Sequence, residues 1–122
     1  MQAVLLGGVT DKVGAAVTSL CFNQQGDLLL VGYANGALCL WDVSRQSVTK
    51  VAEHTLAIVH TLFLGQDAPA ARYFRAISGD CKGKVALHTF SQQMLPLLRR
   101  FSVTTQVYKI SFKLFFILAS GL

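Results

Sequence analysis

The chain carries one internal repeat, and this repeat constrains the fold more than any other feature. Residues 17–22 return as residues 59–64, an offset of 59 − 17 = 42, and residues 32–42 return as residues 79–89, an offset of 79 − 32 = 47. The five additional residues of the second copy fall in the loop from Gly65 to Phe74. Two structural units of about 40 to 47 residues are therefore expected, and such units are built to be stacked.

Each unit shows the pattern of short antiparallel strands. Val17–Phe22 combines β-branched and aromatic residues, Leu28–Val31 is a continuous apolar run, and Asn35-Gly36 favours a type I′ hairpin turn. The expected strands are 17–22, 28–31, 37–41 and 48–51 in the first unit and 58–64, 73–78, 84–90 and 97–103 in the second, with 91–96 as a connecting loop. The predicted fold is all-β, an incomplete propeller of about two four-stranded antiparallel blades.

The pattern also divides the chain. We expect a lead-in at residues 1–12, two blades at residues 13–51 and 52–106, and an apolar tail at residues 107–122. The tail leaves the repeat pattern, and both a ninth strand and a short terminal helix are compatible with it, as in a truncated or alternatively terminated product. Its apolar stretch Leu114 to Ala119 is far shorter than the 20 or so residues of a spanning helix, which predicts a cytoplasmic chain without a membrane span.

Composition excludes several classes of function. Apolar residues make up 52% of the chain and charged residues 14%, which favours a folded domain with surface for a neighbour to cover. The net charge of +5 is spread without a basic run, so nucleic acid is not expected as a partner. The three cysteines, Cys21, Cys39 and Cys81, lack Cys-x-x-Cys spacing, and His54, His60 and His88 lack a ligand motif, so no metal is expected.

No catalytic or cofactor-binding residues are predicted. Asp42 and Asp80 fall in blade turns and Asp67 in a loop, without a neighbouring base in the sequence. Ser78-Gly79-Asp80 is not part of a Gly-x-Ser-x-Gly motif, and the Gly79 to Lys84 segment is one residue short of a phosphate loop. The chain is therefore expected not to be an enzyme.

The loop between the first two strands of the second unit is the best candidate for recognition. It contributes Gln66, Asp67, Arg72, Tyr73 and Arg75, and Tyr and Arg are common interface anchors. For any one of these residues, a tolerated surface insertion is the competing interpretation. Trp41 has two interpretations as well: a core anchor between blades, or a residue that faces a partner.

The two units resemble WD repeats. Residues 31–42 end in Trp41-Asp42 after an Asn35-Gly36 hairpin, and His54 precedes the second unit as the family's His does. The resemblance implies structural roles for Trp41, Asp42, Asn35, Gly36, His54 and Ser78. In the family a His, a Ser or Thr, an Asp and a Trp form a hydrogen-bonded tetrad. Here Lys82 is assigned to the Asp position and His88 to the Trp position, so the second tetrad is expected to be incomplete.

In the first unit Asn35 and Trp41 are present, but Lys12 and Val31 occupy the other two tetrad positions. Both tetrads are therefore expected to be incomplete, with rigidity coming from packing.

Several segments resemble more closely the amino-terminal propeller of the vacuolar protein sorting-associated protein 8 family. They are residues 21–33, 40–43, 53–54, 60–67 and 79–83, and Leu64-Gly65-Gln66-Asp67 is the most specific of them. The resemblance covers roughly residues 13–106. It implies a role in endosomal tethering within the CORVET complex, with tethering subunits and a Rab-type GTPase as protein partners and peripheral association with endosome membranes through them.

The predicted function is thus a noncatalytic interaction module of an endosomal or vacuolar tethering subunit, in vesicle-mediated protein transport to the vacuole or lysosome. The alternative is a generic WD-repeat scaffold of another multiprotein assembly.

Overall fold

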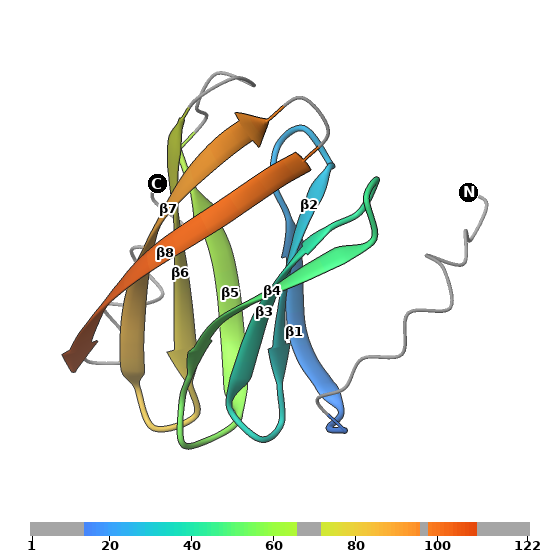
Figure 1. Cartoon of the computed structure of the whole chain (residues 1–122). Helices are drawn as coiled ribbons and strands as arrows, with labels where there is room; N and C mark the ends of the chain where they lie inside the picture. The colour runs from blue at the N-terminus through green and yellow to red at the C-terminus, as the bar shows by residue number, and fades with distance from the viewer. Residues whose placement is uncertain (1–13, 66–71, 96–97, 110–122) are drawn as a thin grey trace.

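The computed structural model describes residues 14–65, 72–95 and 98–109, which form two antiparallel sheets of four strands each (Figure 1). Blade one contains β1 (Val17–Phe22), β2 (Leu28–Tyr33), β3 (Ala37–Asp42) and β4 (Ser47–Glu53). Blade two contains β5 (Ile58–Leu64), β6 (Tyr73–Asp80), β7 (Lys84–Leu95) and β8 (Leu98–Lys109). Strand order follows chain order in both sheets, and the prediction of an all-β fold with two four-stranded blades is confirmed.

The strand ends differ from the prediction mainly in blade two. The segment 91–96 was expected to be a loop, but β7 continues through it to Leu95, and β8 begins at Leu98. The pairing of β7 with β8 is unbroken from Lys84↔Lys109 to Leu95↔Leu98. The polar residues of this segment were mistaken for a loop because they lie on a long hairpin whose pairing does not depend on an apolar pattern.

The other boundaries shift by a few residues. β4 continues past Val51 to Glu53, so the first blade extends beyond residue 51, and β8 continues past Gln106 to Lys109. The lead-in at residues 1–12 and the tail from residue 110 onward lie outside the described residues, so the alternatives for the tail stay predictions.

A hairpin turn is present at Tyr33–Gly36, but the prediction of a type I′ turn was wrong, because Asn35 is not among the residues of positive φ and Gly36 takes the fourth position of the turn. The Gly36 amide donates to the Tyr33 carbonyl at 3.0 Å, and the Asn35 side-chain oxygen accepts a hydrogen bond from the Ala37 amide at 3.1 Å. Gly36 has φ of 91°, a left-handed conformation that favours glycine. The His54 amide then donates to the Gly36 carbonyl at 2.7 Å, which ties the entry to blade two onto this turn.

The two blades pack face to face through an apolar core. Alternate side chains of the central strands point into it, as the two-residue period of a strand requires. The buried members are Leu28, Leu30, Leu38 and Leu40 of blade one and Ile58, Ala76 and Phe90 of blade two. Phe74 stacks on Phe90 with ring centroids 4.8 Å apart, and Phe101 meets Phe74 edge-on at 6.1 Å.

The innermost strands β1 and β5 join the blades by polar contacts. The hydroxyls of Ser19 and Thr61 are 2.8 Å apart, and the Thr18 hydroxyl donates to the Ile58 carbonyl. A side chain at Gly32 would overlap Ile58, whose Cγ2 atom would lie 2.5 Å from an added Cβ. Glycine at this position therefore lets β2 and β5 approach closely.

The other face of blade one, which points away from blade two, is also apolar. Val31, Tyr33, Ala37 and Cys39 are buried there, with Leu29 and Trp41 packed partly against them. Around this cluster Val17, Leu20, Phe22 and Val48 are between 43% and 56% exposed. Burying more of these side chains against a further sheet would be favourable.

Candidate interaction surface and a buried polar network

Four polar side chains meet in the seam between the blades. His54 precedes β5, Ser78 and Asp80 lie on β6, and His88 lies on β7. His54 Nδ1 is 3.1 Å from Asp80 Oδ2, His54 Nε2 is 2.8 Å from Ser78 Oγ, and Ser78 Oγ is 2.8 Å from His88 Nε2. His88 Nδ1 continues the series to the Thr105 hydroxyl of β8 at 2.9 Å. The network thus links β6, β7 and β8 of blade two to one another and to His54, which lies in the segment before β5.

One arrangement of protons satisfies the whole network with both imidazole rings neutral. The ionised Asp80 carboxylate only accepts, so His54 donates from Nδ1, and its Nε2 accepts from the Ser78 hydroxyl. Ser78 Oγ then accepts from His88 Nε2–H, and His88 Nδ1 accepts from Thr105. Each bond has one proton, so the four groups are buried without an unpaired donor or acceptor.

The surroundings favour an ionised Asp80 and an uncharged His88. Burial alone would raise the pKa of the Asp80 carboxyl, but hydrogen bonds from His54 and from the amides of Lys82 and Lys84 outweigh burial and lower it. For His88, burial first and the nearby His54 second lower the pKa to about 4. The network therefore combines an ionised Asp80 with a neutral His88 at neutral pH.

This geometry corrects the assignment of the second tetrad. Asp80, rather than Lys82, provides the carboxylate that pairs with His54, and His88 takes the fourth position. Lys82 contributes its backbone amide, which donates to Asp80 Oδ1 at 2.9 Å. The prediction of an incomplete network in blade two was wrong, because Asp80 caps the hairpin turn with one oxygen and holds His54 with the other.

The Ser78–His54–Asp80 distances match those of a hydrolase triad, but the site is closed. Ser78 and His88 are 0% exposed, and the Ser78 hydroxyl is hydrogen-bonded to two imidazole nitrogens, one from His54 and one from His88. A nucleophile needs an open approach to a substrate and a base that receives its proton. The arrangement can therefore fix the packing of the blade, and it offers no room for a substrate.

Blade one has no such network among its described residues. Val31 and Trp41 occupy the positions equivalent to Ser78 and His88, and the Asn35 side chain is used locally in its turn. Trp41 does not lie between the two described blades, and its two interpretations, a core anchor against another blade or a residue that faces a partner, stay predictions. It lies half-buried on the face of blade one that points away from blade two.

A second polar cluster joins the blades at the other end of the seam. Arg99 of β8 places Nη1 2.8 Å from Asp27 Oδ2 and 3.6 Å from Asp42 Oδ2, and its guanidinium also bonds Gln92 and covers the Phe101 ring. The Arg99 side chain is 7% exposed. Burial opposes ionisation of Asp27, but hydrogen bonds from Asn23 and Arg99 lower the pKa of its carboxyl. Sequence reasoning assigned Asp42 to a turn and missed this clamp, since Arg99 is 72 residues from Asp27.

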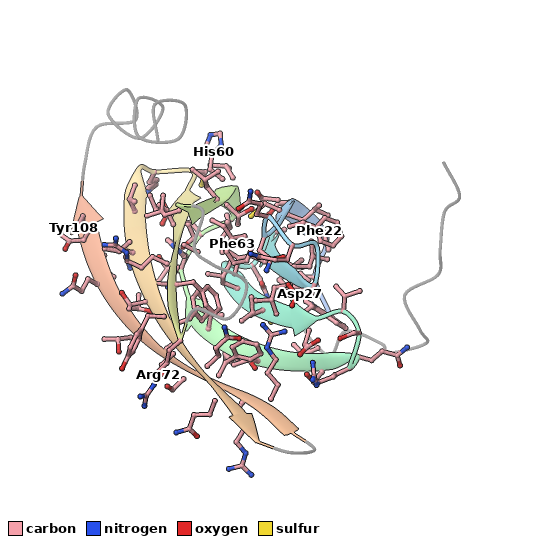
Figure 2. All side chains as sticks on the ribbon, turned by 90° about the horizontal axis from the view of Figure 1, so that it is seen from above. Phe22, Asp27, His60, Phe63, Arg72 and Tyr108 are labelled. Atoms are coloured by element: carbon pink, nitrogen blue, oxygen red, sulfur yellow. The ribbon has the colours of Figure 1, made fainter. Side chains whose placement is uncertain are left out.

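The predicted interaction loop is described only in part. Gln66 and Asp67 lie outside the described residues. Arg72, Tyr73 and Arg75 are exposed, and Tyr73 and Arg75 belong to the start of β6. The Arg72 guanidinium carbon lies 5.6 Å from the centroid of the Tyr73 ring, a cation–π contact. Figure 2 shows Arg72 on the outside of blade two, on the side away from Asp27 and blade one.

No three potential ligand side chains gather into a metal site within the described part of the chain. Among the same residues there is no helix with the length and apolar character needed to cross a membrane.

Comparison with known proteins adds the family. A family model described as the Vps8 beta-propeller matches residues 3–109, which is most of the 122-residue chain and includes both blades. Domains of this family are typically noncatalytic interaction modules. A search of curated proteins found no match.

Proposed function

Because the chain belongs to the Vps8 β-propeller family, we propose that it is a noncatalytic protein–protein interaction module of a vesicle-tethering subunit. The family suggests a role in vacuolar or endosomal tethering. The module would act in vesicle-mediated protein transport to the vacuole or lysosome. The observation that carries the proposal is the family match across both blades, from residue 3 to residue 109.

The structure supports a binding role over a catalytic one. The cluster of titratable groups that could perform hydrolysis is sealed between the blades, where its members are bonded to each other. The side chains that remain available lie on broad sheet faces, which suit contact with another protein. Partners on this proposal are other subunits of the CORVET tethering complex and a Rab-type small GTPase, and association with endosome membranes would be peripheral and through these proteins.

A capture experiment tests the proposal. The chain is immobilised and presented with purified tethering subunits and with Rab-type GTPases in the GTP and GDP states, and the retained fraction is measured. We expect retention of at least one tethering subunit or of the GTP form of a GTPase. The matched control is Gly32→Val, which should disrupt the contact between β2 and β5 because an added Cβ would overlap Ile58, and binding should be lost with the fold.

Two results would contradict the proposal. One is equal retention by the wild-type chain and the unfolded control, which would indicate nonspecific adhesion. The other is binding confined to the components of an unrelated assembly, which would favour a generic scaffold role instead.

A further inference from the structure

The hairpin of β7 and β8 is longer than its counterpart in blade one. With the repeat offset of 47, Thr89 corresponds to Asp42, where β3 ends, but β7 continues to Leu95. On the partner strand, Thr104 pairs with Thr89, and β8 begins earlier, at Leu98. The hairpin extension, defined as residues 90–95 and 98–103, thus has no equivalent in blade one. A neighbouring blade of blade one's size would leave it uncovered.

The two faces of this extension have different surroundings. Arg99 and Phe101 point toward blade one, where Arg99 bonds Asp27 and Phe101 packs against the core. Because side chains alternate along a strand, Arg100 and Ser102 point the opposite way, and both are exposed. Figure 1 shows β7 and β8 leaning across the end of the molecule near the β1–β2 turn, with one side of the pair open.

Exposed side chains of β6 continue this open face. Tyr73 pairs with Ser91, and Ser91 pairs with Ser102, so the three side chains form one row across the sheet. Neighbouring rows bring in Arg75 and Arg100. The arginine face, as we define it, consists of Tyr73, Arg75, Ser91, Arg100 and Ser102, together with the guanidinium of Arg72, which is included because it lies over the Tyr73 ring.

Contacts within this face hold part of it in place. The Arg72 carbonyl accepts a hydrogen bond from the Gln92 amide at 2.9 Å, which fixes the Arg72 backbone against β7. Its guanidinium packs over the Tyr73 ring, and Tyr73 is 57% exposed. An aromatic ring and guanidinium groups that are already positioned lose little entropy on binding.

The charge of this face is not balanced by any described neighbour. Asp80 is the acidic residue of the described part of blade two, and its carboxylate is buried and bonded to His54. Asp27 and Asp42 interact with Arg99 on the opposite side of the sheet. Arg72, Arg75 and Arg100 therefore form no ion pair among the described residues, and their fields add up on one open surface.

We propose that the arginine face binds an acidic, extended segment of a partner protein. Residues of one face recur about every 6.6 to 7 Å along a strand, and neighbouring strands lie about 4.8 Å apart. Arg75 and Arg100 lie in the rows on either side of the row that contains Tyr73, and the Arg72 guanidinium lies over the Tyr73 ring. The three guanidinium groups can therefore each reach a different carboxylate of an extended peptide in a bidentate pair, while Ser91 and Ser102 offer hydroxyl donors. Amphipathic surfaces that insert into membranes combine charge with several apolar side chains, and this face has Tyr73 as its one large apolar side chain.

This inference rests on the proposed interaction role and specifies the chemistry of one partner. The test uses the full chain and a fluorescent oligo-glutamate peptide, with binding followed by anisotropy at about 0.15 M ionic strength. We expect the double variant Arg72→Gln/Arg100→Gln to bind the peptide at least about tenfold more weakly, since two charge-assisted contacts are lost. The matched control, Lys50→Gln/Lys82→Gln, removes the same charge elsewhere and should change binding by less than about twofold.

Three results would overturn the inference. Equal weakening by both double variants would show attraction to net charge alone.

Vesicles of phosphatidylcholine and phosphatidylserine provide a second experiment. Loss of vesicle binding in the arginine variant with peptide binding unchanged would identify a lipid surface as the partner instead. If the arginine variant loses the peptide but keeps its tethering partners, the acidic segment belongs to another protein and the proposed function stands. If the wild-type chain ignores the peptide but captures tethering subunits, only the present inference fails.

Discussion

The two blades place different chemistry at equivalent positions of one repeat. The offset of 47 residues matches Val31, Tyr33 and Trp41 of blade one with Ser78, Asp80 and His88 of blade two. In blade one these positions belong to an apolar cluster on the face that points away from blade two. In blade two they form a hydrogen-bonded network in the seam between the blades.

The difference shows that polar side chains can be buried in the seam between the blades, while the outer face of blade one is apolar. A buried polar network is stable only where every member has a partner, and the seam supplies those partners from the blade itself and from His54. An apolar face needs no matched donors, so it can pack against a sheet of less specific sequence. The two copies of the repeat therefore share the strand pattern, but at the equivalent positions blade two is held by hydrogen bonds and blade one by apolar packing.

The largest effect is expected at the turn between β2 and β3, to which the entry to blade two is bonded through the His54 amide. A Cβ atom at Gly36 would overlap the carbonyl group of His54, and its φ of 91° is unfavourable for other residues. Gly36→Ala should therefore lower the free energy of unfolding by about 4 kcal/mol, from backbone strain and displacement of His54. The control is Gly26→Ala, which has a φ of 75° but nothing within 4 Å of the added atom, so about 1 kcal/mol is expected. If urea denaturation gave equal losses for Gly36→Ala and Gly26→Ala, the contact between the Gly36 turn and His54 would not contribute to stability.

Removing the hydroxyl of Ser78 should show that hydrogen bonds stabilise blade two more than packing at the equivalent position stabilises blade one. Ser78→Ala leaves His54 Nε2 and His88 Nε2 buried without their shared partner, at a cost of about 3 kcal/mol. Val31→Ala at the equivalent position removes only two methyl groups and should cost about 1 to 2 kcal/mol. Chemical denaturation of both variants measures the two losses. A Ser78→Ala cost no larger than that of Val31→Ala would mean that the network contributes no more than packing.

Much of the fold could be predicted because the repeat and its turns are local features. The strands Val17–Phe22 and Ile58–Leu64 and the hairpin at Gly36 follow from residues within a few positions of each other. The long β7–β8 hairpin could not be predicted in the same way. Its extension is held by Arg99, whose partner Asp27 on blade one is 72 residues away in the sequence, and by Phe101, which packs against the core.

The buried network was only half predictable. His54 and Ser78 are identified by their resemblance to a known tetrad, but the choice between Asp80 and Lys82 depends on where the hairpin turns. The assignment to Lys82 lies two residues too late in the hairpin, since the side chain that reaches His54 is that of Asp80. Asp80 could have been found by requiring a carboxylate as the partner of the His54 imidazole, since the lysine ammonium group cannot accept a hydrogen bond.

The buried polar network of blade two should also make the free energy of unfolding depend on pH. The unfolded chain protonates His88 near its ordinary value of 6.5, but burial and the nearby His54 lower its pKa in the folded state to about 4. The unfolded state therefore binds more protons between these values, and stability is complete above about pH 6.5 and falls as the pH decreases toward 4. At pH 5 the loss should be about 2 kcal/mol relative to pH 7.5.

The variant His88→Gln tests the source of this dependence, because an amide does not titrate. Its unfolding free energy should change less between pH 7.5 and pH 5 than that of the wild type, whatever its absolute stability. An unchanged slope in His88→Gln would assign the pH dependence to other groups.

The smallest effect concerns the clamp at the far end of the seam, where two adjacent arginines have opposite surroundings. Arg99 is buried against Asp27 and Asp42, and Arg100 is exposed on the other face of β8. Arg99→Gln should lower the free energy of unfolding by about 1 to 2 kcal/mol, because Asp42 loses a buried counter-charge while Asp27 is partly compensated by water. Arg100→Gln should change it by less than about 0.5 kcal/mol.

Salt distinguishes the two arginines further. Screening acts mainly on exposed charges, so added salt should leave most of the difference between the Arg99→Gln chain and the wild type in place. The same pair of variants should show the reverse order in binding an acidic peptide, where Arg100→Gln has the larger effect. Loss of stability in one variant and loss of binding in its neighbour would establish that β8 uses one face to join the blades and the other to meet a partner. Equal stability losses in the two variants would contradict the assignment of the faces.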